Sequence, residues 1–268
     1  MKTRMANLAL VALLALSAFP IADGLKVTGG LISETVAPGQ ELDHEIYVYL
    51  DKDEYVSPLL TVNLSGFAMD ENGTNIMLPP ERDNKQFSAK DFLTVTPMEI
   101  QIQPDVPQKI LVKAQIPDDV GTGSRYALIS LKTSTPVKEM ENIVITKVIQ
   151  VPVFFKIKGS EFVETGEIKD LDTLKSNEGI VINLRFMNTG NVHYKPTAKA
   201  VLKNQEGEIL AASEPLESSS SVLPTGVWLF SMPIVSESEL SPGDYVIEAA
   251  VTDEEGKLID SGEVALNI

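Results

Sequence analysis

The chain contains few side chains of the kinds that perform acid–base or nucleophilic chemistry. It has two histidines, His44 and His193, and no cysteine. Each histidine lies beside an expected strand, and neither has a nucleophile and a carboxylate at a spacing typical of a catalytic triad. The Gly-x-Ser-x-Gly motif of hydrolases is also absent from the sequence. We therefore expect turn or surface histidines, no catalytic residue, no cofactor, and a protein that is not an enzyme.

One acidic run has the local composition of a cation site. Asp51-Lys52-Asp53-Glu54 places hard oxygen ligands, which calcium prefers, at alternating positions. No glycine follows at the offset that a helix–loop–helix calcium loop requires. An acidic turn at the end of a strand is therefore favoured over a metal site, and we predict no metal ligands.

Aromatic residues are too scarce to indicate a sugar-binding cleft, which needs a carboxylate pair and is usually lined with aromatic rings. They make up 6% of the chain, with a single tryptophan. Trp228 alternates with Phe230 and Met232, which is more typical of one core face of a strand than of a sugar platform. An accessory domain of a carbohydrate-active enzyme stays open as an alternative.

Two triplets match the acceptor pattern for N-glycosylation, Asn63-Leu64-Ser65 and Asn72-Gly73-Thr74. Asn63 is expected on the polar face of a strand and Asn72 in a turn, so both side chains are expected to be accessible. The triplets matter only if the host glycosylates exported proteins.

The elements that must position these residues are strands. Apolar and polar residues alternate in short runs, as at residues 180–187, and a period of two puts one face of a strand on a core and the other in water. Residues 70–73 (Asp-Glu-Asn-Gly) predict a tight turn. Residues 92–103 are expected to form a strand. Residues 143–157 are expected to form a central strand buried on both faces, in which Pro152 indicates a bulge or an edge position.

Many short strands at even spacing, separated by Gly-rich turns, predict an all-β sandwich or barrel. They fall into two segments, residues 25–158 and 159–268, joined by a short connection. We therefore expect two domains that touch.

The first 24 residues have the layout of a secretory signal peptide. Lys2 and Arg4 precede an apolar stretch at residues 8–19, which is short for a membrane span. Cleavage after Ala22 or after Gly24 fits, and an uncleaved anchor is the alternative. No second apolar span follows, so we expect no membrane span in the mature chain and a secreted or cell-surface location.

The formal net charge of −16 limits the partners. Such a surface repels nucleic acid and anionic lipid headgroups, so we expect no nucleic-acid partner. It favours solubility and is compatible with a basic partner.

The first segment resembles immunoglobulin-like domains of the pilus-chaperone kind. The resemblance lies in residues 93–97 (Leu-Thr-Val-Thr-Pro), 110–113 (Ile-Leu-Val-Lys), Ile116-Pro117, and 123–129 (Gly-Ser-Arg-Tyr-Ala-Leu-Ile). These residues are more similar still to the paired domains of WxL-interacting cell-surface proteins. The family implies a peptidoglycan-binding β-sandwich followed by a second sandwich that binds a host or partner protein.

The second segment is similar to the same family at residues 165–168, 182–191 and 240–245. The resemblance implies two tandem immunoglobulin-like β-sandwich domains after a signal peptide.

Together these observations predict a non-enzymatic, exported protein of the cell surface or envelope. It would bind an envelope polymer or another surface protein through a sandwich face, a loop or an edge strand. The main alternative is a secreted, periplasmic-type chaperone or assembly factor that lends a strand to surface subunits.

Overall fold

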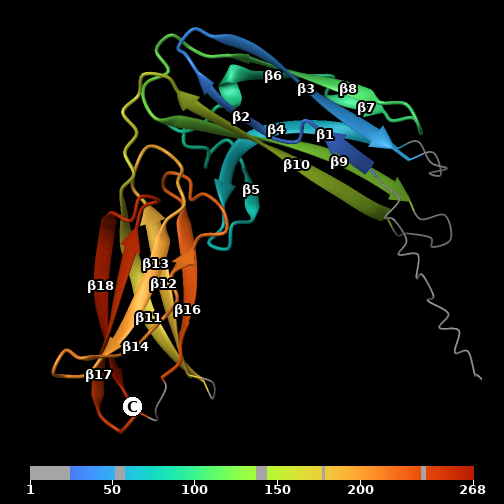
Figure 1. The fold of residues 1–268 in the computed structure, drawn as a ribbon. Coiled ribbons are helices and arrows are strands. Elements are labelled where there is room, and N and C mark those ends of the chain that lie inside the picture. The colour runs from blue at the N-terminus through green and yellow to red at the C-terminus, as the bar shows by residue number, and fades with distance from the viewer. Residues whose placement is uncertain (1–24, 52–57, 137–143, 177–178, 237–239) are drawn as a thin grey trace, which may run out of the picture.

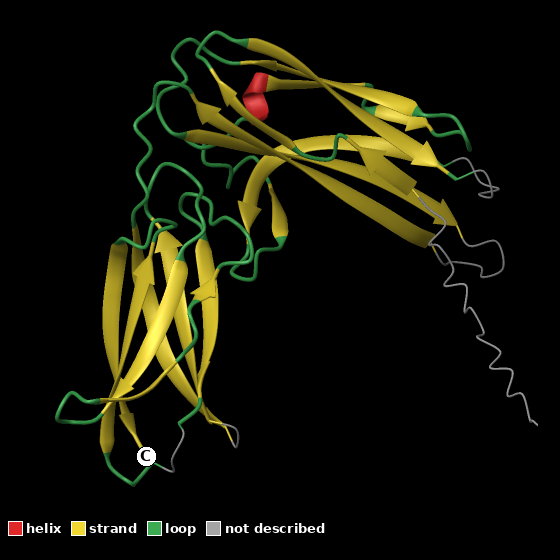
Figure 2. Cartoon of the chain, viewed as in Figure 1, coloured by secondary structure: helices red, strands yellow, loops and turns green. Residues whose placement is uncertain are grey.

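The computed structural model describes residues 25–51, 58–136, 144–176, 179–236 and 240–268. These residues form two β-sandwiches set at an angle to each other, with one short 3-10 turn, Lys90–Phe92, as the only helical element among them (Figures 1 and 2). The predicted all-β class with two tandem immunoglobulin-like sandwiches is thus confirmed. The predicted signal peptide, residues 1–24, lies outside the described residues.

The first sandwich packs a four-stranded sheet, in the order β1-β3-β8-β6, against a six-stranded sheet, β2-β10-β9-β4-β5, in which β7 also pairs with β4. All pairs are antiparallel except β2 with β10, which is parallel. The strands are β1 (Leu25–Thr28), β2 (Ile32–Val36), β3 (Glu41–Leu50), β4 (Leu59–Met69), β5 (Asn75–Leu78), β6 (Leu93–Thr96), β7 (Glu99–Gln101), β8 (Gln108–Gln115), β9 (Ser124–Pro136) and β10 (Val144–Ile157).

The second sandwich packs a three-stranded sheet, β11-β12-β16, against a five-stranded sheet, β14-β13-β17-β18, in which β15 pairs with β13. The strands are β11 (Gly166–Ser176), β12 (Gly179–Asn188), β13 (Thr197–Lys203), β14 (Ile209–Ala212), β15 (Leu216–Glu217), β16 (Val227–Ile234), β17 (Asp244–Thr252) and β18 (Leu258–Asn267).

Each sandwich encloses its own core of alternating apolar side chains. In β12, Ile180, Ile182, Leu184 and Phe186 are all buried while the intervening side chains are only partly covered. Burying such a side chain stabilises a fold by about 1.5–3 kcal/mol. The predicted alternation therefore places on one face of each strand the apolar side chains whose burial holds the two sheets together. The boundary predicted at residue 158 falls in the connection between β10 and β11, and remains a prediction.

The strand expected over residues 92–103 is wrong in its extent. β6 pairs with β8 in one sheet, whereas β7 pairs with β4 in the other. Pro97 lies between the two strands and has no backbone N–H to donate, so a continuous ladder through it is disfavoured. The chain crosses from one layer to the other at this point.

Within the described part of the chain, no helix is both long and apolar enough to cross a membrane.

Candidate functional site: the outer edge of β10

The longest strand of the first sandwich, β10, is only half covered by its neighbours. β9 pairs with it over residues 144–156, but on its other side β2 pairs only with residues 153–157. No other strand of the described residues pairs with this side. The outer edge of β10, residues 144–152, is therefore open to another strand.

Backbone hydrogen bonds show which groups of β10 point outward. Ile157 donates its N–H to the carbonyl oxygen of Gly123 on the β9 side (3.0 Å), whereas Lys158 donates to Val36 of β2 (2.7 Å). Successive residues of a strand direct their backbone groups to opposite sides, and the register with β9 has no shift. The even-numbered residues from 144 to 152 thus direct their backbone groups toward the open side.

Pro152 ends this row of outward groups. Its nitrogen, which carries no hydrogen, faces the open side immediately before the segment that β2 pairs with. Proline is tolerated at such a position because no ladder hydrogen bond is lost. The predicted edge position of Pro152 is confirmed. The expected burial on both faces, predicted for residues 143–157, is wrong for residues 144–148, because all five of these side chains are exposed.

Apolar side chains follow the open edge. Val144, Ile145 and Val148 are 56%, 53% and 51% exposed, and Leu31, one residue before β2, is 56% exposed. Isolated exposed apolar residues are normal, but a long apolar strand with an unpaired edge is a template for pairing with another chain.

A shallow polar hollow lies on the outer face of the same sheet. It has a volume of about 350 Å³ and is lined by Leu59, Thr61, Asn63, Lys132 and Ser134 from β4 and β9. Hydroxyl, amide and ammonium groups in such a row are suited to hydrogen bonding with a polar ligand.

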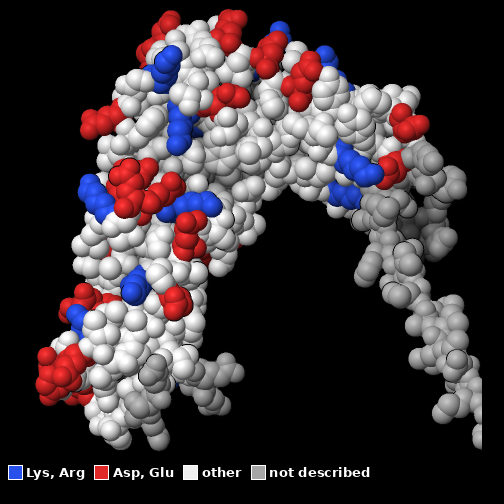
Figure 3. Space-filling model, in the orientation of Figure 1, with Lys and Arg blue, Asp and Glu red and all other residues white. Residues whose placement is uncertain are grey.

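The charge distribution leaves the region of β10 comparatively free of acidic groups. Figure 3 shows Asp and Glu side chains spread over the convex outer side of the molecule, while the concave side within the angle of the two sandwiches is largely uncharged. β10 borders this concave side (Figure 1). On the face shown, a partner approaching β10 from the concave side meets few negative side chains.

The two predicted glycosylation acceptors lie where the sequence placed them, and their modification remains a prediction. Asn63 is exposed on β4, within the polar hollow. Asn72 is exposed in the turn between β4 and β5.

The two histidines have different surroundings. His44 on β3 contacts the carbonyl oxygen of Gly29 through Nε2 (3.0 Å). His193 is half-buried between the sandwiches, with Nδ1 3.1 Å from the hydroxyl of Tyr126. A surface or turn position was expected for both, and this was wrong for His193 because only the packing of one sandwich on the other covers it.

Most of the acidic run considered as a cation site, residues 52–54, lies outside the described residues. Asp51 is described and forms an ion pair with Lys26 (2.9 Å). Among the described residues, no group of three or more histidines, cysteines or acids is placed to hold a metal ion.

The apolar triplet of β16 belongs to the core, as predicted. Trp228, Phe230 and Met232 are all buried in the second sandwich. These rings therefore form no sugar platform.

The two sandwiches meet where the turn between β4 and β5 docks on the edge of β16. The carbonyl oxygen of Glu71 accepts the N–H of Leu229 (2.9 Å), and its carboxylate accepts Nε–H of Arg185 (2.9 Å). Gly73 approaches Trp228 so closely that a Cβ at this position would lie 2.8 Å from the indole. We call residues 70–73 the docking turn.

Asp70 holds the docking turn in shape. Its carboxylate accepts the backbone N–H groups of Asn72 (2.9 Å) and Thr74 (2.8 Å), and its carbonyl oxygen accepts the N–H of Gly73 (3.0 Å). The hydrogen bond from Thr74, followed by those from the rest of the turn, keeps the pKa of Asp70 below its ordinary value. The shape of the turn is thus set locally, before it meets the second sandwich.

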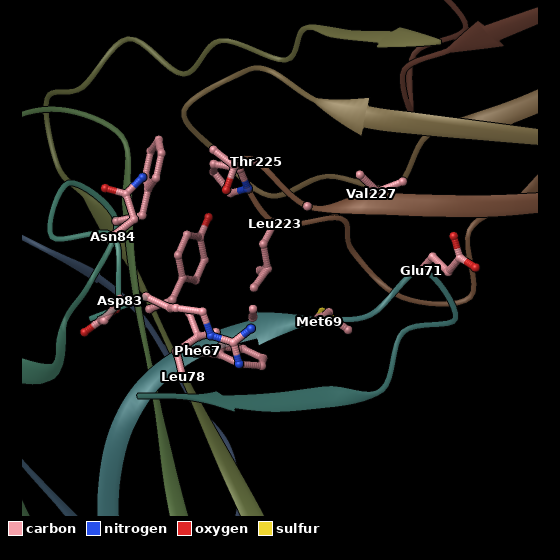
Figure 4. Close-up of a pocket in the computed structure, with 15 residues that line it drawn as sticks. Phe67, Met69, Glu71, Leu78, Asp83, Asn84, Leu223, Thr225 and Val227 are labelled. Atoms are coloured by element: carbon pink, nitrogen blue, oxygen red, sulfur yellow. The ribbon is translucent and has the colours of Figure 1, made fainter. Parts of the chain in front are cut away.

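A cavity of about 290 Å³ lies beside the docking turn, between the two sandwiches. Phe67 and Met69 of β4 face Leu223 and Thr225 from the loop before β16 (Figure 4). Phe67 and Leu223 are buried in one apolar cluster with Tyr126. The joint between the sandwiches therefore has an apolar centre and a hydrogen-bonded rim.

Sequence reasoning expected the two domains to touch and Pro152 to mark a bulge or an edge position, but it located neither the open segment of β10 nor the contacts of the joint. Pro152 was the one available signal for the edge, because a proline in an otherwise β-branched strand indicates an unpaired side. No local pattern indicates that Glu71 and Leu229, 158 positions apart, share a hydrogen bond.

No family model and no curated protein matches this sequence. Several solved structures are similar in fold. The class 5 fimbriae chaperone CfaA is 10% identical, with 90% of this chain and 98% of that chain covered and a TM-score of 0.42. The E. coli chaperone DraB is 10% identical, with coverages of 91% and 98% and a TM-score of 0.40. A chain from the complex of the Salmonella enterica SafA pilin with the SafB chaperone is 12% identical, with coverages of 91% and 96% and a TM-score of 0.38.

Similarity at this level says nothing about function. Chaperones of fimbriae or pilins are among the similar structures, in line with the pilus-chaperone part of the expected resemblance. The resemblance to WxL-interacting proteins remains a prediction.

Proposed function

We propose that the protein is a non-enzymatic, exported binding protein that pairs with an extended segment of another exported protein along β10. The single observation that carries this proposal is the open outer edge of residues 144–152, which includes the exposed side chains of Val144 and Val148. Strand addition supplies affinity through main-chain hydrogen bonds and specificity through side chains at alternate positions.

The proposed role is that of a chaperone or assembly factor for surface subunits. A subunit with an incomplete sheet exposes its own edge and apolar groove, and a strand with exposed apolar side chains covers both. Such side chains are supplied by Val144, Ile145 and Val148. They lie outside the buried cluster of the first sandwich, so a partner can contact them while the core stays intact. A permanent surface binding protein would use the same edge, but its partner would fold without it.

Site-specific crosslinking tests the proposal. A photoreactive amino acid replaces Val148 in the full chain in its native host, and a matched variant carries it at Leu258, which is 58% exposed on the second sandwich. We expect one exported protein to be captured from Val148 and not from Leu258. In the purified complex, the outward amides of Thr146 and Val148 should become protected from hydrogen exchange. Equal capture from both positions, or unprotected outward amides, would contradict strand pairing.

The polar hollow on β4 and β9 favours a second candidate, binding of an envelope polymer. Its lining groups Thr61, Asn63, Lys132 and Ser134 are suited to a hydroxyl-rich ligand. Sedimentation with isolated cell wall distinguishes the two candidates. Asn63→Leu would abolish co-sedimentation if the hollow binds the polymer, and would leave crosslinking from Val148 intact.

A further inference from the structure

His193 is the one histidine placed at the joint between the sandwiches. It belongs to the loop after β12 of the second sandwich, yet its ring packs on aromatic side chains of the first. The ring centroids lie 5.6 Å from Tyr126 on β9 and 5.1 Å from Phe154 on β10. The side chain is only partly covered, and the rest of the ring becomes exposed if the sandwiches move apart or the loop is displaced.

The direction of the hydrogen bond at this position depends on the protonation state of the ring. Burial raises the pKa of the Tyr126 phenol, so the hydroxyl keeps its proton and can donate it. In the neutral tautomer that carries its hydrogen on Nε2, His193 Nδ1, 3.1 Å away, accepts this hydrogen. A doubly protonated ring has no acceptor, so the hydroxyl must turn and accept Nδ1–H instead, and the cost of protonation comes from placing a positive charge in the partly buried joint.

The surroundings offer an imidazolium no compensating charge. The β2, β4 and β10 strands and the loop before β16 present the following side chains to the hollow beside the ring: Leu31, Ser33, Met69, Phe154, Ser220 and Ser221. Among the described groups that act on His193, the titratable ones are Tyr126 and Lys156, and Lys156 is positive. Burial first, and then Lys156, lower the pKa of His193 to about 4.

We propose that His193 is a proton-sensitive latch, in which the neutral ring holds the two sandwiches together and protonation releases them. The latch concerns the joint and does not depend on the function proposed for β10. It assigns to an otherwise unused, half-buried histidine the role of coupling acidity to the angle between the domains.

The direction of the effect follows from linkage. Opening the joint returns the ring to water, where its pKa is 6.5, so the open form binds the proton more tightly than the closed form. The contribution of His193 to the closed joint is complete above pH 6.5 and is lost as the pH falls toward 4. Between pH 7.5 and pH 5 the equilibrium constant for opening should rise roughly 25-fold.

Hydrogen exchange at a bond that crosses the joint tests the latch. The N–H of Leu229 donates to Glu71 across the joint, whereas the N–H of Ile116 donates to Gln40 within the first sandwich. In the full chain, after correction for the intrinsic pH dependence of exchange, we expect the protection of Leu229 to fall roughly 25-fold between pH 7.5 and pH 5. The protection of Ile116 should not change.

Two variants separate His193 from general acid effects. His193→Gln keeps an acceptor for Tyr126 but cannot gain a proton in this range, so its Leu229 protection should be independent of pH. His44→Gln removes the other histidine, which lies within the first sandwich, and should behave like the parent. A flat profile in the parent chain, or the same fall in His193→Gln, would overturn the proposal. If His193→Gln does not fold, the NMR titration of His193 in the parent decides, because an ordinary pKa near 6.5 would overturn it as well.

Discussion

The outer edges of β16 and β10 differ in what lies against them. The edge of β16 in the second sandwich is met by the docking turn, through the hydrogen bond from Leu229 to Glu71 and the contact of Gly73 with Trp228. The edge of β10 in the first sandwich stays open from residue 144 to residue 152. Proteins ordinarily blunt or cover exposed edges, because a free edge promotes aggregation.

The difference indicates that the fold does not require the edge of β10 to be open. The same chain places a turn of only a few residues against β16 at Trp228 and Leu229, and β2 could cover more of β10 if it were longer. At Leu229, the edge of β16 is protected by a hydrogen bond to the docking turn. The predictions below test whether the covered edge depends on docking and whether the open edge is dispensable for folding.

The largest effect is expected from Gly73→Val. Gly73 has a φ of +85°, where a β-branched residue is strained by about 1–2 kcal/mol, and the new side chain would also overlap Trp228. We expect a lower midpoint in thermal unfolding. The protection of the Leu229 amide should also be lost, because the docking turn can no longer reach β16.

Gly256→Val is the matched control. Gly256 has a φ of +82° in a turn with the same hydrogen bonds, made here by Asp253, but no atom lies within 4 Å of its missing Cβ. This variant should show the backbone strain alone and keep the Leu229 amide protected. If both variants lose stability equally and both keep that protection, the contact of Gly73 with Trp228 does not hold the joint.

These two glycines also show what sequence can and cannot predict. The Asp-x-x-Gly pattern predicts both turns, because the hydrogen bonds that define them are local. It does not indicate that one turn docks on a second domain and the other projects into solvent, because that depends on contacts between residues more than a hundred positions apart. The alternation in β12 and β16 likewise predicts the core. The open part of β10 depends instead on where β2 ends, and nothing within β10 except Pro152 indicates it.

A smaller effect is expected from Glu71→Gln, which removes the charge at the docking turn and leaves its backbone carbonyl in place. Arg185 keeps Asp170 (3.1 Å) and Asp172 (3.8 Å) as partners, and the carboxylate of Glu71 is itself partly exposed. The hydrogen bond that Arg185 donates to Glu71 is the main reason that the pKa of Arg185 is raised. We expect the protection of Leu229 to fall by about two- to threefold at low salt, and the difference to vanish near 1 M salt.

Glu167→Gln is the control for this ion pair. Glu167 pairs with Lys169 on the same strand, β11, at 2.6 Å. Its removal takes away one negative charge without touching the joint. A loss of Leu229 protection as large as that of Glu71→Gln would attribute the effect to net charge rather than to docking.

The smallest effect on stability is expected from Val148→Glu at the open edge. Val148 is half exposed and outside the buried cluster, so the free energy of unfolding should change by less than about 0.5 kcal/mol, as for Leu258→Glu on the second sandwich. Only Val148→Glu should reduce concentration-dependent self-association in sedimentation velocity, since a charge on an edge strand opposes pairing. The open edge of β10 carries exposed apolar side chains, so it is the edge through which we expect this association. A loss of more than about 1 kcal/mol in Val148→Glu would instead mean that Val148 supports the first sandwich, and that the open edge persists because folding requires it.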